Sequence, residues 1–231
     1  MGFTEVEVAG FYGLAPEQFR DALRKHQLRP GSVLFPYELF RDSLDKIIMA
    51  AKLLGANLVG CAWIPHQKTF SQQDADQATK LFNEAGEKLK QKGLHFFYHA
   101  HGYEFAPLPD GSTLFEQMAA NMKAGTADFE LDVFWAWHGG ADPVLLMKKY
   151  PGRFIALHLK QMREGQPTGE YTGSAPDESS VSLGKGVMDF KLILQTAMQT
   201  GIDHFYIEDE ASTAVPQVKA SLMYLDLLRK N

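Results

Sequence analysis

Residues 94–105 read LHFFYHAHGYEF, an apolar run that ends in polar residues, and this pattern decides the fold. Its aromatic residues favour a β-strand, and the glycine that follows permits a turn. Alternate side chains of a strand share a face, so we expect His99 and His101 on one face and Glu104 just beyond them. These three residues are candidate metal ligands. For this stretch alone, histidines that cap a strand and hydrogen-bond a loop are an equally good interpretation.

Runs of β-branched and aromatic residues recur along the chain and alternate with longer segments of helical period. This alternation is typical of βα units around a parallel sheet. We expect seven strands, at residues 5–9, 32–35, 57–64, 95–101, 129–134, 154–160 and 204–209. We expect a helix that opens at residues 15–17 and further helices at residues 43–54, 72–92, 114–122, 144–149, 190–200 and 218–229.

The strand pattern favours a barrel over an open doubly wound sheet. The first turn, residues 10–13, lacks the G-x-G-x-x-G pattern that a doubly wound nucleotide-binding sheet carries there. We therefore expect an α/β fold of the (β/α)8 TIM type that lacks its first βα unit in this chain. We expect one domain over residues 1–231, because no linker-like segment divides the sequence. The irregular segment at residues 161–187 is interpreted as an active-site lid or a subunit contact.

Composition is that of an ordinary globular protein, with 45% hydrophobic and 22% charged residues in a chain of 231. The sequence contains neither a transmembrane run nor a signal peptide, so a cytoplasmic location is expected for the chain as given, and a periplasmic or secreted one if an N-terminal segment is missing. A net charge of −5 without a basic stripe argues against nucleic-acid binding. Cys61 lies in an apolar run and is interpreted as a core residue.

Polar residues recur near the carboxyl ends of the last four strands, where βα barrels build their sites. The four are Glu104, Asp132, His158 and Glu208. A carboxylate that faces a barrel interior is costly unless it is paired or coordinates a cation. Three carboxylates and one imidazole suit Mn²⁺, Mg²⁺, Co²⁺ or Zn²⁺. Taken singly, each residue is more simply a satisfied polar group in the core, and the repetition over four strands argues for a metal site.

The sequence resembles the sugar phosphate isomerase/epimerase group of the xylose isomerase-like TIM barrels, in runs at residues 98–105, 130–132, 157–160, 184–190 and 206–208. The resemblance extends from about Gly2 to the end of the chain. The wider group includes ketose 3-epimerases, inosose dehydratase and, more distantly, endonuclease IV. The motifs therefore specify the fold and the metal site better than the substrate.

The resemblance implies a role for individual residues. Glu104, Asp132, His158 and Glu208 match the four metal ligands of the group, and His101 matches a histidine that supports the metal or contacts substrate. Members of the group usually begin with one more strand and helix than this chain has. Two further departures concern substrate contacts: a histidine common at the end of the strand at residues 33–35 is absent, and Gln161 stands where an aspartate is common.

The function we predict is that of a divalent-metal-dependent sugar isomerase or epimerase that removes a proton next to a metal-bound carbonyl. Glu104 and Glu208 are the expected proton-transfer pair. The expected substrate contacts are His101, Lys160, Trp63 and His99. Two alternatives are a keto-inositol or keto-sugar dehydratase and a catalytically inactive sugar-binding barrel. The expected partner is a small carbohydrate, with neither nucleic acid nor membrane, and the sequence leaves a homo-oligomer open.

Overall fold

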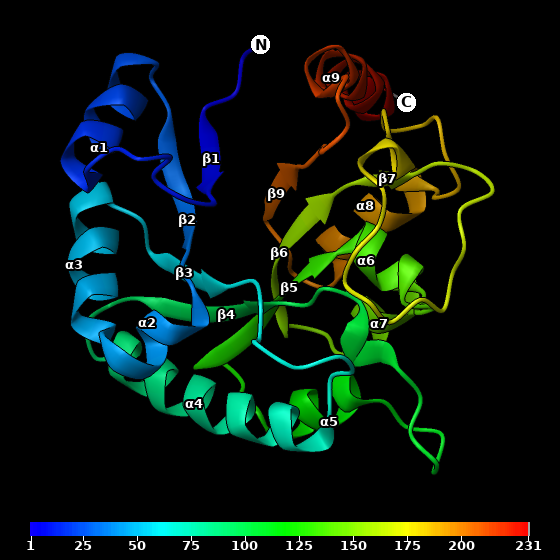
Figure 1. The fold of residues 1–231 in the computed structure, drawn as a ribbon. Helices are drawn as coiled ribbons and strands as arrows, with labels where there is room; N and C mark the ends of the chain where they lie inside the picture. Colours follow the sequence, from blue (N-terminus) through cyan, green and yellow to red (C-terminus); the bar gives the residue numbers. More distant parts are fainter. Residues whose placement is uncertain (231) are drawn as a thin grey trace. The chain divides into compact units, whose positions relative to one another are not determined.

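The computed structural model describes residues 1–230, and the chain packs as two compact units (Figure 1). The first unit comprises Met1–His99 and Leu114–Phe129, and the second comprises Ala100–Thr113 and the chain from Glu130 onward. The strand β5 (Ala127–Asp132) gives its first three residues to the first unit and its last three to the second. The expectation of a single domain stays a prediction.

The first unit contains a parallel sheet in the strand order β1-β2-β3-β4, followed by the start of β5. Its other strands are β1 (Glu5–Val8), β2 (Arg29–Leu34), β3 (Leu58–Cys61) and β4 (His95–His99). Its helices are α1 (Pro16–Lys25), α2 (Tyr37–Asp42), α3 (Leu44–Leu54), α4 (Gln72–Lys90) and α5 (Leu114–Asn121). Each of the first three strands is thus followed by a helix that leads back to the next parallel strand, as the sequence predicts.

Aromatic side chains fix α4 against β4 in the first unit. The ring centroid of Phe82 lies 4.8 Å from that of Phe96 and 5.2 Å from that of Tyr98. Aromatic pairs at such distances contribute stabilisation beyond the apolar area they bury. The helix begins at a capping box, in which the Ser71 hydroxyl accepts from the Asp74 amide and the Asp74 carboxylate accepts from the Ser71 amide.

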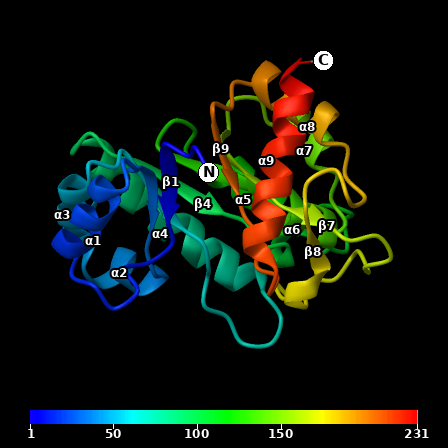
Figure 2. The same ribbon diagram turned by 90° about the horizontal axis from the view of Figure 1, so that it is seen from above.

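The second unit holds the end of β5, then β6 (Phe154–Leu159) and β9 (His204–Ile207), in that strand order. β6 and β9 are parallel, with His158 beside Tyr206 in the register. The remaining elements of this unit are η1 (Tyr103–Phe105), α6 (Val133–His138), α7 (Pro143–Lys149), β7 (Gln161–Met162), η2 (Asp177–Ser179), β8 (Ser180–Val181), α8 (Phe190–Gln199) and α9 (Ala214–Lys230). Figure 2 shows α9 in front of the other elements of this unit.

All seven expected strands and all seven expected helices are present, and α2 and α6 were not predicted. Several boundaries were wrong. β4 ends at His99, so His101 lies beyond the strand and the alternation argument does not apply to it. β5 ends at Asp132, because that residue caps α6 and Val133 already belongs to the helix. The segment at residues 161–187 is not wholly irregular, since β7 and β8 pair antiparallel within it.

The core prediction for Cys61 is confirmed, because the residue is buried in β3. Within residues 1–230, none of the helices is long and apolar enough to cross a membrane.

Candidate metal centre

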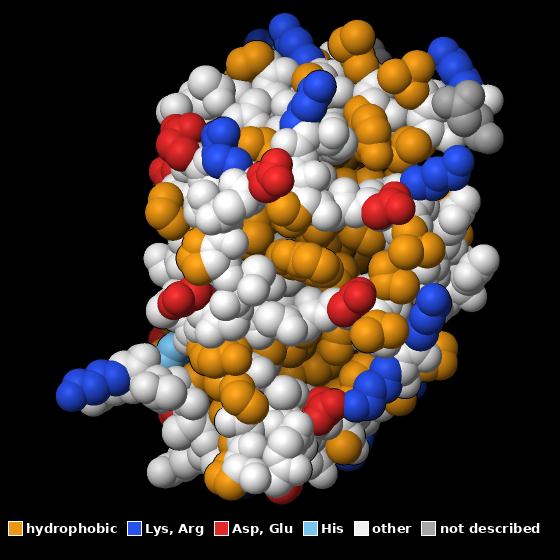
Figure 3. Space-filling view, turned by 90° about the vertical axis from the view of Figure 1, so that its right-hand side faces the viewer, with side chains coloured by type: hydrophobic (Ala, Val, Ile, Leu, Met, Phe, Trp, Pro, Cys, Tyr) orange, Lys and Arg blue, Asp and Glu red, His pale blue; other side chains and the backbone are white. Residues whose placement is uncertain are grey.

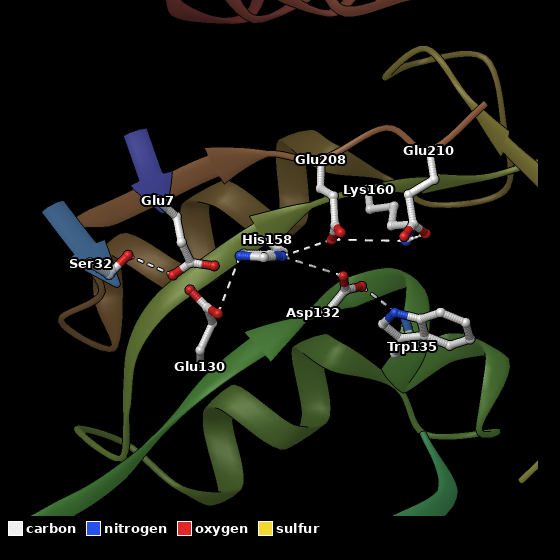
Figure 4. A network of polar contacts seen from close by, with 9 residues as sticks. All are labelled: Glu7, Ser32, Glu130, Asp132, Trp135, His158, Lys160, Glu208 and Glu210. Carbon is white, nitrogen blue, oxygen red and sulfur yellow. Dashed lines mark hydrogen bonds and ion pairs between the residues drawn. The ribbon is translucent and has the colours of Figure 1, made fainter. Parts of the chain in front are cut away.

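Three of the predicted metal ligands come together at the carboxyl ends of the strands in the second unit (Figure 4). Asp132 is the last residue of β5, His158 lies near the end of β6, and Glu208 directly follows β9. The Nδ1 atom of His158 lies 2.8 Å from Oε2 of Glu208 and 3.7 Å from Oδ2 of Asp132. The convergence follows from the fold, because the ends of neighbouring parallel strands meet at one edge of the sheet.

The two oxygens of Asp132 are used differently. Oδ1 accepts a hydrogen bond of 2.9 Å from the backbone amide of Trp135 and so caps the start of α6. Oδ2 is buried and has no hydrogen-bond partner among the described residues. A buried carboxylate oxygen without a partner carries a desolvation cost that a bound cation removes. This atom therefore fits a metal ligand.

The imidazole of His158 is held between carboxylates on both of its nitrogen atoms. On the side away from Asp132 and Glu208, Nε2 lies 3.2 Å from Oε2 of Glu130. A neutral imidazole donates from only one nitrogen. With the proton on Nε2 and donated to Glu130, the Nδ1 lone pair faces the Asp132 and Glu208 oxygens, an arrangement that fits a cation between them.

Exposure differs among the carboxylates around His158. The side chains of Glu130 and Asp132 are fully buried, whereas that of Glu208 is 32% exposed. Carboxylates buried without a compensating cation or proton are expensive. The two buried groups are therefore suited to holding a cation or a ligand in place, while Glu208 is also accessible to a bound molecule.

Lys160 extends the cluster away from His158. Its side chain is buried, its Nζ atom forms an ion pair with Glu210, and the same atom lies 3.8 Å from Oε2 of Glu208. Burial by itself lowers the pKa of Lys160, but the nearby carboxylates, Asp132 and Glu208 first, outweigh burial and raise that pKa above its ordinary value. The charged ammonium also lies over the ring of Trp135, 5.0 Å from its centroid. Lys160 is thus a fixed positive charge beside Glu208.

The fourth predicted ligand, Glu104, lies in η1 and is fully buried. Both of its carboxylate oxygens accept from the backbone amide of His101 at 3.1 Å, and the His101 ring lies 5.1 Å from that of Trp135. The turn is pressed against α6: Gly102 has φ +96°, and a Cβ atom there would meet the Trp135 carbonyl oxygen at 2.9 Å. The close approach therefore holds η1 and α6 in position against each other. The role of Glu104 as a metal ligand stays a prediction.

The other two predicted substrate contacts lie in the first unit. His99 is buried at the end of β4, and Trp63 is 42% exposed and stacks on His66 with ring centroids 5.2 Å apart. In the same unit, the Ser32 hydroxyl donates a hydrogen bond to Glu7, a pair labelled in Figure 4. Both substrate roles stay predictions.

Glu130 and Glu210 belong to the cluster but have no predicted role. Strand alternation places Glu130 on the same face as Asp132, and Glu210 follows Glu208 at the same spacing of two. This spacing of two residues is the sequence feature from which both residues could have been placed near the site. What the sequence does not reveal is that Glu130 contacts the far nitrogen of His158 and that Glu210 pairs with Lys160.

A protein-family model described as the xylose isomerase-like TIM barrel matches residues 1–228. The chain belongs to this family. The family assignment confirms the resemblance and the barrel class predicted from the sequence. No curated protein matches the chain.

Solved structures of this family's fold cover nearly all of the chain. A sugar phosphate isomerase/epimerase from Parabacteroides distasonis ATCC 8503 is 26% identical, with a TM-score of 0.77, over 97% of this chain and 83% of that one. The IolI protein with a bound zinc atom is 14% identical, with a TM-score of 0.74, over 99% of this chain and 89% of that one. An L-ribulose 3-epimerase is 12% identical, with a TM-score of 0.69, over 98% of this chain and 84% of that one.

Proposed function

We propose that this xylose isomerase-like barrel is a divalent-metal-dependent isomerase or epimerase of a monosaccharide or a related polyol ketone. The observation that carries the proposal is the convergence of Asp132, His158 and Glu208 around a buried carboxylate oxygen that has no hydrogen-bond partner within residues 1–230. The sugar phosphate isomerase/epimerase at 26% identity supports the substrate class.

Asp132, His158 and Glu208 would hold the cation, with Glu104 as the fourth ligand. When bound, such a cation polarises a carbonyl oxygen and makes the neighbouring C–H group more acidic. Oxygen and nitrogen donors of this kind suit Mn²⁺, Mg²⁺, Co²⁺ or Zn²⁺.

Glu208 is the proposed base, because its side chain is more exposed than those of Glu130 and Asp132, which also lie beside His158. Glu104 is the proposed partner that returns the proton on the other face of the substrate. Lys160 helps to orient Glu208, since its charged ammonium lies 3.8 Å from the Glu208 carboxylate. Glu130 orients His158 through Nε2.

The test is hydrogen–deuterium exchange at the carbon next to the carbonyl, followed by NMR in D₂O with Mn²⁺ and a panel of ketopentoses, ketohexoses and keto-inositols. We expect exchange with one class of ketose, and a loss of about 10²–10⁴-fold in the exchange rate for Glu208→Gln, since this variant removes the base. The matched control is Glu178→Gln, which removes an exposed carboxylate that bonds Ser212.

Other outcomes of the same experiment separate the alternatives. An absorbing enone or dione product would identify a dehydratase, because dehydration begins with the same proton removal and then expels hydroxide. An absence of exchange across the panel, together with sugar binding that Glu208→Gln leaves unchanged, would contradict the enzyme and indicate a binding barrel.

A further inference from the structure

Lys160 and Glu210 form an ion pair whose two members are buried to very different degrees. Lys160 directly follows β6, and Glu210 lies three residues beyond the end of β9. The Lys160 side chain is 1% exposed, whereas that of Glu210 is 54% exposed. Figure 4 shows the two side chains meeting next to Glu208. A ligand that enters the site therefore meets the Glu210 carboxylate, while the lysine that was predicted to contact substrate is buried.

Contacts on several sides hold the Lys160 ammonium in place. Its nitrogen lies 5.1 Å from the ring centroid of Phe134 and 5.0 Å from that of Trp135, and it pairs with Oε2 of Glu210. The same nitrogen lies 3.8 Å from Oε2 of Glu208. One fixed ammonium thus reaches both carboxylates, which places Glu210 beside the proposed base even though the Glu210 side chain is exposed.

The positive charge of Lys160 is already balanced. The charged groups that act on its ammonium are Asp132, Glu208 and Glu210, all of them carboxylates of the same unit. Glu210 compensates the lysine, and Asp132 and Glu208 together match the charge of one divalent cation. These described side chains therefore offer no unpaired positive charge to a phosphate or carboxylate group of a substrate. On the face of the molecule in Figure 3, Lys and Arg side chains likewise lie among acidic and hydrophobic ones.

The exposed carboxylate of Glu210 offers a hydrogen-bond acceptor. Oε2 accepts from the Lys160 ammonium, and Oε1 accepts no hydrogen bond from residues 1–230. An ionised carboxylate accepts hydrogen bonds but cannot donate one, so its partner must be a group that donates. A sugar hydroxyl donates a hydrogen bond, whereas a phosphate ester brings negative charge and is repelled.

We propose that Glu210 accepts a hydrogen bond from a substrate hydroxyl and so selects an uncharged ketose over a phosphate ester whose charge lies at this end of the site. The inference rests on the proposed function, because it names the substrate class of the same centre. Glu210 is then the member of the ion pair that contacts substrate. Its carboxylate acts by attracting the correct substrate and by repelling the wrong one.

The test is isothermal titration calorimetry of the full-length, Mn²⁺-loaded protein. The probes are D-xylulose, D-ribulose, D-fructose and D-psicose, each beside its 1-phosphate and its terminal phosphate ester. We expect an uncharged ketose to bind at least about tenfold more tightly than one of its two esters. Glu210→Gln should reduce this preference by at least about tenfold, because an amide does not repel the ester.

Two further variants separate charge from other effects of substitution. Glu210→Asp keeps the negative charge and should keep the preference for the uncharged ketose. Glu178→Gln removes an exposed carboxylate that bonds Ser212 and should leave the preference unchanged. Circular dichroism spectra and melting temperatures check that the variants fold, which substitutions of an exposed side chain should permit.

Three results would overturn the inference: a wild type that binds both esters as tightly as the ketose, a preference that Glu210→Gln leaves unchanged, or a panel in which no uncharged ketose binds. Failure of the proposed function is read separately, from hydrogen–deuterium exchange. A ketose that shows the expected preference but no exchange contradicts the enzyme alone. Exchange that is faster in a phosphate ester than in its ketose contradicts the role of Glu210 alone.

Discussion

His158 lies between carboxylates with different surroundings, and these surroundings separate their roles. Glu130 contacts Nε2, on the side of the ring away from Asp132 and Glu208, and so acts through the imidazole on a cation held at Nδ1. On the Nδ1 side, Asp132 presents a buried oxygen to which no described residue forms a hydrogen bond. Glu208 lies on that side too and is the one that solvent reaches. We propose that Glu130 positions the imidazole, that Asp132 binds the cation, and that Glu208 both binds the cation and transfers a proton.

Glu130→Gln tests the positioning role. We expect metal affinity to fall by roughly 10–100-fold, because the carboxylate that orients His158 and raises its basicity is lost. Isothermal titration calorimetry of the metal-free protein with Mn²⁺ measures this affinity. Asp128→Asn is the matched control, since Asp128 is also a buried carboxylate of β5 that contacts a histidine, His95, at 2.7 Å. It should cost stability and leave metal affinity unchanged. Equal losses in both variants would contradict the role of Glu130.

Cys61 provides a test of the core. Burial raises the pKa of its thiol to about 12, so the thiol is protonated in the folded protein at pH 8 and the reactive thiolate is absent. In the unfolded chain the thiol ionises near a pKa of about 8.5. Folding is therefore favoured by this group below that pH, and the contribution is lost as the pH rises towards the folded pKa.

We expect Cys61 to resist a disulfide reagent at pH 8 and to react completely once urea unfolds the protein. The absorbance of the released thiolate measures the reaction. Rapid and complete labelling of the folded protein would contradict the burial of Cys61 in β3.

At the scale of the elements, the turn η1 and the helix α6 form one structural block. A Cβ atom on Gly102 would lie 2.9 Å from the Trp135 carbonyl oxygen, and one on Gly139 would lie 2.6 Å from the Gly102 carbonyl oxygen. α6 begins at Asp132, and η1 carries Glu104. Two of the four proposed ligands are therefore positioned by this contact between two backbones.

Gly102→Ala tests this block. We expect a loss of roughly 1–3 kcal/mol in the free energy of unfolding, from the positive φ angle and from the close approach of the Trp135 carbonyl. We also expect weaker metal binding, since the block moves. Gly111→Ala separates the effect of backbone strain from that of the close approach, because Gly111 has φ +83° but no atom lies within 4 Å of its Cβ position. Gly111→Ala should lose stability alone, and unchanged metal affinity in both variants would contradict the coupling.

The strands and most helices were predictable because they rest on periodicity, which is a local property of the sequence. α6 was missed because its six residues, Val133–His138, are almost all buried and carry no amphipathic pattern. Its start is set by Asp132, which looked like a residue within a strand. The pairing of Lys160 with Glu210 was unpredictable for another reason: it depends on side chains 50 residues apart.

At the scale of the whole molecule, a metal bound only by the folded protein stabilises it. Mn²⁺ at about 100 times its dissociation constant should raise the free energy of unfolding by roughly 2.7 kcal/mol. Urea unfolding curves with and without the metal measure this difference. Asp132→Asn should show a much smaller difference, because one proposed ligand is lost. Equal stabilisation of the wild type and the variant would place the metal elsewhere.

The most direct measurement of the proposed centre is the metal stoichiometry of the purified, Mn²⁺-loaded protein after dialysis, determined by plasma mass spectrometry. The comparison includes Asp132→Asn and His158→Gln, with Asp128→Asn as the control for a buried carboxylate outside the site. We expect about one ion per chain in the wild type and the control, and far less than one in the two site variants. A wild type without metal, or site variants that retain a full equivalent, would contradict the metal centre.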